Sequence, residues 1–167
     1  LTGKGTVNSD NPSLSIRTIP SNQQPLRIIL DSHLRVKRDS KLLQQSNVIV
    51  MYGADKNLNL TSLKNTKAEF IKIPLLDNKI NLTEVMAYLN KLEINELWVE
   101  AGPDLNGELL KFGLLDELIT YTAPYIMGGS ANSVFNAPIL KDMKDKIKIS
   151  VLDCRSIGED IRIQAMV

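Results

Sequence analysis

Residues 96–125 read ELWVEAGPDLNGELLKFGLLDELITYTAPY, and this stretch decides the fold class. The sequence Glu-Leu-Trp-Val-Glu at residues 96–100 indicates a strand, and residues 117–125 indicate another. The apolar residues between them recur at helical spacing: Leu105, Leu109, Leu110 and Phe112. Gly113 then ends the predicted helix in the usual C-terminal glycine position. A strand–helix–strand order indicates a βαβ crossover, and therefore parallel strands with helices on the sheet faces.

Upstream of this stretch the chain has three short runs rich in Ile and Val, at residues 26–31, 47–52 and 69–73. Such runs are typical of strands covered on both faces. A helix is predicted over residues 81–92, with Asn81 or Thr83 as its N-cap. Its apolar side chains are Val85, Met86, Leu89 and Leu92.

The end of the chain predicts a closing antiparallel strand pair at residues 146–154 and 160–167, because only a short link joins them. The sequence therefore predicts an α/β fold with a mixed, mostly parallel sheet flanked by helices. With 167 residues and no shift in composition, a single domain is expected.

Composition and charge exclude several classes of function. The net charge of +1 gives no global attraction to nucleic acid or to an anionic membrane. No window has the apolar length of a membrane span, so a cytoplasmic protein is expected. The single cysteine, Cys154, excludes a disulfide framework and is expected to be a buried, inert thiol. The single histidine, His33, argues against a histidine-rich metal cluster.

Two polar segments could bind an anion. Residues 3–17 combine two glycines with Thr6, the carboxylate of Asp10 and the guanidinium of Arg17, although a plain surface loop would have a similar composition. At residues 99–107 a strand ends, Gly102 turns the chain and a helix begins at once, so that backbone N–H groups could meet a phosphate. A plain turn between strand and helix is the alternative, because no GxGxxG fingerprint is present.

Two further segments carry a weaker signal. Residues 31–35 place a hydroxyl, an imidazole and a guanidinium after the first clear strand, where a phosphate could bind or where the loop is simply polar. The paired acids Asp116 and Glu117 could act as general acid and base, but we favour solvated cap and turn residues.

Five motifs occur in order between Gly5 and Pro124, within a resemblance that runs from Leu1 to Val167 and closes with Gly-Glu-Asp-Ile at residues 158–161. They are Gly-Thr-Val-x-x-Asp-x-Pro-x-Leu-x-x-Arg, Arg-Ile-Ile-Leu-Asp-Ser, Val-Glu-Ala-Gly, Gly-Leu-Leu-Asp-Glu-Leu and Ala-Pro. Together they resemble the C-terminal reductase domain of the bifunctional riboflavin-biosynthesis deaminase/reductase, the RibD family. The resemblance implies a three-layer fold like that of dihydrofolate reductase and a homodimer. It also implies NADPH-dependent reduction of 5-amino-6-(5-phosphoribosylamino)uracil, in which the ribosyl chain becomes ribityl.

The resemblance also implies roles for individual residues. Leu14, Arg17 and Glu100 match substrate contacts, with Arg17 close to the substrate phosphate. The cofactor contacts that it implies are Thr6, Asp10, Ser32, Gly102, Pro103, Asp104, Leu105, Asn106, Gly107 and Glu108. The segment from Gly102 to Glu108 would hold the NADPH diphosphate. From residue type alone, residues 31–35 could receive the 2′-phosphate of NADPH. Either Asp10 or Glu100 would assist proton delivery, and the sequence does not rank them.

The chain departs from the family pattern in two respects. The zinc-binding His-x-Glu and Cys-x-x-Cys signature of the deaminase is absent from these 167 residues, so zinc is expected only in an upstream deaminase domain. The first strand and helix of the reductase are also expected to lie upstream of Leu1. Two alternatives stay open: a stand-alone reductase of this fold acting on another pterin or pyrimidine, and a non-catalytic nucleotide-binding relative.

Overall fold

A computed structural model describes residues 1–19, 21, 23–53, 63, 65–129, 131–136 and 142–167. The chain forms two compact units, which we call the N-terminal unit (Leu1–Gly102) and the C-terminal unit (Pro103–Val167). Each unit has its own sheet, and each is described separately. The single domain expected from the sequence stays a prediction.

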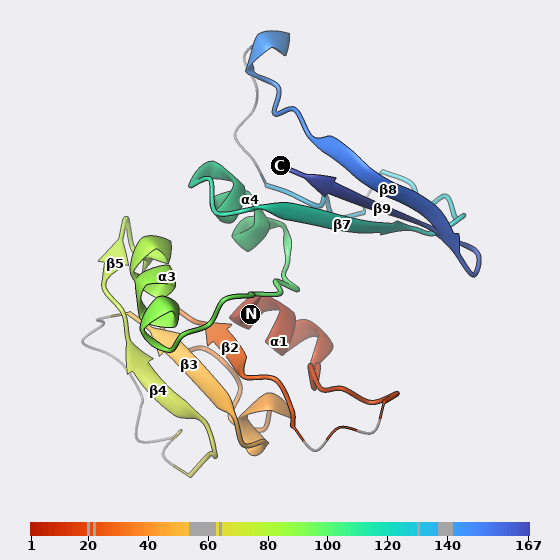
Figure 1. Cartoon of the computed structure of the whole chain (residues 1–167). Coiled ribbons are helices and arrows are strands. Elements are labelled where there is room, and N and C mark those ends of the chain that lie inside the picture. Colours follow the sequence, from red (N-terminus) through yellow and green to blue (C-terminus); the bar gives the residue numbers. More distant parts are fainter. Residues whose placement is uncertain (20, 22, 54–62, 64, 130, 137–141) are drawn as a thin grey trace. The chain divides into compact units, whose positions relative to one another are not determined.

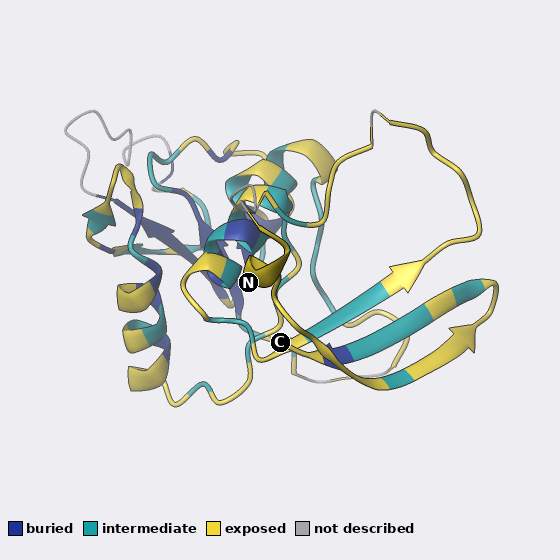
Figure 2. Ribbon diagram, turned by 90° about the horizontal axis from the view of Figure 1, so that it is seen from above, coloured by how far each residue is buried: buried dark blue, intermediate teal, exposed yellow. Residues whose placement is uncertain are grey.

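The N-terminal unit is built on a parallel sheet of order β1-β2-β3-β4 (Figure 1). Its strands are β1 (Thr2–Gly3), β2 (Arg27–Leu30), β3 (Val48–Tyr52) and β4 (Glu69–Lys72). Every residue of β2 and β3 is buried, as Figure 2 shows in dark blue. This confirms the prediction that the first two apolar runs are covered on both faces. The third run is an edge strand instead, and both of its terminal residues are exposed.

One face of this sheet carries a compact apolar core. Ile29 on β2 and Val48 and Val50 on β3 lie on the same face because side chains alternate along a strand. Side chains from helix α1 (Lys4–Asp10) and from the 3-10 helix η1 (Leu42–Gln44), together with Val36 and Leu63, complete this cluster. Burial of these side chains fixes how α1 lies on the sheet.

The α1 helix was not predicted by the pattern of the sequence. Gly, Asn, Ser and Asp are poor helix formers, and they dominate the seven residues of α1. Tertiary packing overrides this weak propensity, because Val7 in the middle of the helix is 1% exposed. Asn11 ends the helix in a left-handed conformation with a φ of 44°.

Helix α3 (Leu82–Lys91) of the N-terminal unit agrees with the sequence prediction. Asn81 is its N-cap, and the Asn81 side chain accepts hydrogen bonds from the backbone N–H groups of Thr83 and Glu84. Leu82, Val85 and Leu89 form its buried stripe, whereas Leu92 is exposed. The short antiparallel hairpin of β5 (Leu75–Leu76) and β6 (Lys79–Ile80), which precedes α3, was not expected.

The C-terminal unit contains α4 (Pro103–Lys111) and an antiparallel sheet of order β7-β9-β8. Its strands are β7 (Glu117–Thr122), β8 (Ser150–Ile157) and β9 (Asp160–Met166), and η2 (Met143–Asp145) precedes β8. After α4, the N–H groups of Gly113 and Leu114 bond to the carbonyls of Leu110 and Leu109, and Gly113 has a φ of 63°. This pattern is a Schellman motif, and it confirms the predicted helix end.

Five details of the sequence prediction are wrong. The strand β7 ends at Thr122 rather than at residue 125. It pairs antiparallel with β9 in the sheet β7-β9-β8, so the βαβ crossover predicted over residues 96–125 does not occur among the described strands. Residues 96–100 are extended but are not a strand, because their described backbone bonds amount to one bridge with Leu1. The closing strand β8 begins at Ser150 rather than at residue 146. Cys154 is exposed, because β8 is an edge strand of a sheet whose two faces are largely open. The α/β class, with its parallel sheet and its closing antiparallel strands, is confirmed.

Candidate functional site

The order of the parallel segments in the N-terminal unit indicates where a ligand can bind. The N–H of Leu1 donates to the carbonyl of Trp98, and the N–H of Glu100 donates to the carbonyl of Leu1. These two bonds place residues 98–100 beside β1, on the side opposite β2. The strands β2, β3 and β4 therefore follow one another on one side of β1, and residues 98–100 later lie on its other side. In open α/β sheets ligands bind at such a switch point, outside the carboxyl ends of the strands.

Several predicted site residues follow the carboxyl ends of these segments. Glu100 ends the run beside β1, and its side chain is exposed. Thr6 and Asp10 lie on α1, which begins directly after β1, and Ser32 follows β2. Gly3 at the end of β1 pairs with Leu30 at the end of β2, so α1 and the loop after β2 leave the same edge of the sheet. The structure thus brings the starts of three predicted segments to one edge.

Asp31 organises the loop that follows β2. Its carboxylate is 1% exposed and accepts hydrogen bonds from the backbone N–H groups of His33, at 3.3 Å, and Val36, at 2.7 Å. The Ser32 hydroxyl accepts a hydrogen bond from the N–H of Ile80 at 3.1 Å, and it keeps its own proton for donation. Asp31 therefore shapes the loop, and Ser32 retains one donor for a ligand.

Two asparagines that the sequence prediction missed hold the loop after β2 against α1. The Asn8 amide donates to the carbonyl of Arg35 at 3.0 Å and accepts from the N–H of Lys37 at 3.1 Å. The Asn11 side chain accepts from the N–H of Lys41 at 2.8 Å. The pair Asn11-Pro12 could have marked the end of α1 in the sequence, since Asn tolerates the left-handed conformation and Pro stops a helix.

We expect Asn8→Ala to lower the free energy of unfolding by about 1–2 kcal/mol, because two hydrogen bonds to the backbone are lost. Chemical denaturation measures this change. Ser9→Ala is the matched control, since the hydrogen bond of the Ser9 hydroxyl among the described residues lies within α1, to the carbonyl of Gly5. An equal loss of stability in both variants would show that Asn8 does not link the two segments.

Two leucines near this edge adopt a conformation that leucine avoids. Leu14 has a φ of 45° and Leu34 a φ of 49°. A left-handed backbone costs about 1–2 kcal/mol at a residue with a Cβ atom. Both side chains pack against the core cluster, which holds them in place. Such strain concentrates at ligand sites, and Leu14 is one of the predicted substrate contacts.

Charged groups at this edge are mostly solvated. Asp10 and Arg17 are exposed, and neither side chain has an ion pair among the described residues. The backbone of neighbouring Ile16 is tied to the Gln24 side chain by bonds of 2.9 and 3.3 Å, which steadies this segment. This edge therefore offers the Arg17 guanidinium to an anion, and it offers the carboxyl groups of Asp10 and Glu100 for proton transfer.

In the C-terminal unit, the predicted cofactor segment forms the first turns of α4. Pro103 opens the helix, where its missing N–H is not needed. Asp104 and Asn106 bond to Asn136 and Val134 through their side chains, at 2.5 and 3.0 Å. Gly107 is buried against the backbone of Asn136. Three of the predicted cofactor contacts thus hold residues 133–136, a role that the sequence did not indicate.

No three His, Cys, Asp or Glu side chains form a group that could hold a metal ion, within the part of the chain that the structure describes. The described helices include none with the length and apolar character of a membrane span.

Comparisons with known proteins bear on the whole chain. The family described as "RibD C-terminal domain" matches residues 1–163. The riboflavin biosynthesis protein RibD of Escherichia coli (strain K12) is 32% identical over 96% of this chain and 46% of its own length. The 5-amino-6-(5-phosphoribosylamino)uracil reductase of Buchnera aphidicola subsp. Acyrthosiphon pisum is 30% identical over 98% of this chain and 83% of its own length.

Solved structures give the same result. Form 2 of Acinetobacter baumannii RibD matches with a TM-score of 0.79 and 29% identity, over 99% of this chain and 45% of that one. The chain spans about half the length of the first curated relatives that it matches, at 46% in the Escherichia coli protein.

Proposed function

Because the chain belongs to the family of the RibD C-terminal domain, we propose that it is the reductase part of a riboflavin-pathway enzyme. The proposed reaction is NADPH-dependent reduction of 5-amino-6-(5-phosphoribosylamino)uracil, which converts the ribosyl chain to ribityl. The observation that carries this proposal is the switch point beside β1, where Glu100 and the start of α1 meet at the carboxyl edge of the sheet. A deaminase domain upstream of Leu1, with its own zinc, is part of the proposal.

Each unit has hydrogen-bond donors that could bind the phosphate groups of a phosphorylated dinucleotide. In the C-terminal unit, the first N–H groups of α4 have no partner within the helix, and a diphosphate would satisfy them. In the N-terminal unit we assign Thr6, Asp10 and Ser32 to the cofactor, and Ser32 keeps a hydroxyl proton for it. When bound, NADPH supplies a hydride. The chain's own residues orient the groups between which this hydride moves.

In the C-terminal unit, the proposed cofactor contacts keep their sequence assignment, from Pro103 to Glu108. The side chains of Asp104 and Asn106 are engaged by residues 133–136, so we propose that this segment contributes backbone N–H groups. Gly107 acts by letting residue 136 approach the helix. Gly102 directly precedes the helix, and because it has no side chain it leaves the turn uncrowded.

The substrate phosphate is assigned to Arg17, and its sugar to Leu14 and Glu100. Arg17 is exposed and can grip a phosphate through two charge-assisted hydrogen bonds. Leu14 presents a strained, fixed backbone at the same segment. Asp10 or Glu100 holds the proton that the reduced imine takes up.

The test uses the full-length protein, with the phosphoribosylamino-uracil and NADPH as substrates, and follows loss of NADPH absorbance. Turnover with this substrate and none with dihydrofolate supports the proposal. Turnover with dihydrofolate alone would favour a reductase with another substrate. A calorimetric titration without NADPH binding would favour a non-catalytic relative.

Replacing Arg17 by Gln should raise the KM for the phosphorylated substrate about 10- to 100-fold and change kcat little, because a charged hydrogen bond to phosphate is lost. Steady-state kinetics measures both constants. Arg38→Gln, at another exposed arginine, is the matched control. An unchanged KM for the substrate in Arg17→Gln would remove the phosphate role from Arg17.

We also propose a homodimer that forms through the antiparallel sheet of the C-terminal unit. On β8 the side chains of Val151 and Leu152 are 59% and 58% exposed, and Ile161 on β9 is 47% exposed. Exposed apolar side chains on an edge strand favour association. The cytoplasmic location stays a prediction.

We expect Leu152→Lys to shift the protein from dimer to monomer in sedimentation-velocity runs at micromolar concentration. A charge in the centre of an apolar contact opposes burial. Ser150→Lys, at the exposed start of the same strand, is the control for added charge alone. A monomeric wild-type protein would contradict the proposed dimer.

A further inference from the structure

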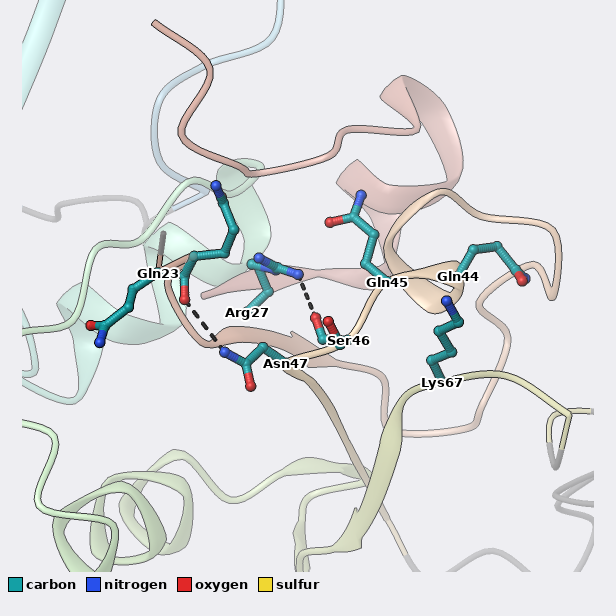
Figure 3. Close-up of a pocket in the computed structure, with 8 residues that line it drawn as sticks. Gln23, Arg27, Gln44, Gln45, Ser46, Asn47 and Lys67 are labelled. Atoms are coloured by element: carbon teal, nitrogen blue, oxygen red, sulfur yellow. Dashed lines mark hydrogen bonds between the residues drawn. The ribbon is translucent and has the colours of Figure 1, made fainter. Parts of the chain in front are cut away.

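A pocket of about 770 Å³ opens at the edge of the parallel sheet opposite the candidate functional site (Figure 3). Arg27 is the first residue of β2, Asn47 directly precedes β3, and Lys67 lies two residues before β4. These residues mark the amino ends of the strands, whereas Glu100 and Ser32 follow carboxyl ends. The pocket is therefore separate from the site assigned to the reductase reaction.

Arg27 is the unusual member of this pocket. It is 4% exposed, and its Nη2 donates to the carbonyl of Ser46 at 2.5 Å. Its Nε and Nη1 are buried and have no hydrogen-bond partner among the described residues. Burial lowers the pKa of the Arg27 guanidinium below its ordinary value, because desolvation disfavours the charge. A buried cation with unmet N–H groups is costly unless a counter-charge is present.

A purely structural role would not need an arginine here. One bond to the Ser46 carbonyl uses a single donor of the five that a guanidinium carries. An apolar side chain would fill the start of β2 without leaving buried donors unsatisfied. The unused donors therefore point to a partner with acceptor atoms.

The lining of the pocket matches an anion. The described residues that line it include two cations, Arg27 and Lys67, and no carboxylate. The other lining residues are neutral hydrogen-bonding side chains: Gln23, Gln24, Gln44, Gln45, Ser46 and Asn47. In Figure 3 the side chain of Gln45 lies beside the guanidinium of Arg27, whereas the amide of Gln23 points away from it. The Gln45 amide ends a flexible side chain that can swing aside to admit a ligand to the guanidinium.

We propose that this pocket binds a small tetrahedral oxyanion, either inorganic phosphate or the phosphate group of a small ester, against Arg27 and Lys67. The planar guanidinium binds the oxyanion through its unmet N–H groups. Lys67 adds a second positive charge from the rim, and the amide side chains donate to the remaining oxygens. The volume leaves room for an organic group attached to the phosphate. The proposal does not rest on the reductase function.

The test is a titration of the full, ¹⁵N-labelled chain with inorganic phosphate at constant ionic strength, followed by NMR. We expect saturable shifts of the backbone signals of Ser46 and Asn47 and of the Arg27 Nε–H signal. Shifts confined to α1 and the loop after β2, or no saturation at all, would overturn the proposal. A parallel titration with ribose 5-phosphate identifies the source: tighter binding indicates an ester, and equal binding indicates the free anion.

Three variants distinguish phosphate binding at this pocket from general electrostatic attraction of phosphate to the protein. Lys67→Gln should weaken phosphate binding about two- to fivefold, as expected for an exposed charge. Lys91→Gln, an equal charge change at the end of α3, should leave binding unchanged. Arg27→Lys keeps the charge but loses the planar fork, and we expect binding about tenfold weaker or more. Should Arg27→Lys fail to fold, Lys67→Gln still decides, because equal effects of Lys67→Gln and Lys91→Gln would refute the site.

Discussion

Glu100→Gln should lower kcat of the reductase reaction by about 10²- to 10⁴-fold, the range that a positioned acid or base contributes. The carboxylate is exposed at the carboxyl end of the segment beside β1, where the topology of the sheet switches direction. Glutamine has nearly the same shape and leaves the backbone bond from Glu100 to Leu1 intact. The fold is therefore expected to survive this change, and the loss falls on proton transfer.

The structure favours Glu100 over Asp10 for this role, a choice that the sequence left open. Asp10 is the last residue of the seven-residue helix α1. At 1.5 Å per residue, that helix carries Asp10 about 10 Å away from the edge of the sheet. Asp10→Asn is therefore expected to raise the KM for NADPH more than it lowers kcat. Removing a negative charge from a helix C-terminus should also stabilise the fold, by about 0.3 kcal/mol.

Rapid-mixing and steady-state kinetics as a function of pH measure the effect at Glu100. A group that delivers the proton gives one limb of the pH profile of kcat, and that limb should vanish in Glu100→Gln. Glu96→Gln is the matched control, because Glu96 lies in the same segment and a glutamine oxygen can still accept from the Trp98 indole N–H. Wild-type kcat in both Glu100→Gln and Asp10→Asn would remove both residues from proton delivery.

Local signals in the sequence predicted those parts of the fold that depend on local physics. The continuous apolar runs at β2 and β3, the Asn81 cap and the Gly113 helix end all follow from side-chain period and backbone conformation. Contacts between distant segments left no such signal. The helical state of α1 depends on burying Val7, and the exposure of Cys154 depends on which strand lies at the sheet edge.

In the candidate site, too, some residues could be predicted from the sequence and others could not. The family motifs predict Arg17, Ser32 and Glu100 as site residues, and these roles stay predictions. The asparagines that hold the loop after β2 were missed, since an Asn in a polar segment is typical of any loop. Arg27 was missed as well, because an arginine at the start of a strand is normally expected to reach solvent.

The largest expected loss of stability comes from Gly107→Ala. A Cβ atom at this position would lie 2.3 Å from the backbone oxygen and 2.7 Å from the carbonyl carbon of Asn136. These are backbone atoms, so no side-chain rotation relieves the clash, and residues 133–136 must move as a unit. The free energy of unfolding should fall by about 2–3 kcal/mol, which combines overpacking with lost hydrogen bonds.

The sign of this effect is not set by helix propensity. Alanine inside a helix is favoured over glycine by about 1 kcal/mol, so Gly107→Ala would stabilise α4 if nothing lay against it. Moving residues 133–136 endangers the bond from the Asn136 N–H to the Pro103 carbonyl, at 2.9 Å, and the bond from the Asn106 amide to the Val134 carbonyl, at 3.0 Å. The clash and these bonds together outweigh the gain in propensity.

Gly5→Ala is the matched control, because Gly5 lies in α1 and a Cβ atom there would meet nothing within 4 Å. Denaturant unfolding should show a small gain for Gly5→Ala, up to about 1 kcal/mol, and a loss for Gly107→Ala. A gain in both variants would mean that residues 133–136 do not lie against α4. In that case the side chains of Asp104 and Asn106 would be available to the cofactor, and their substitution should weaken NADPH binding directly.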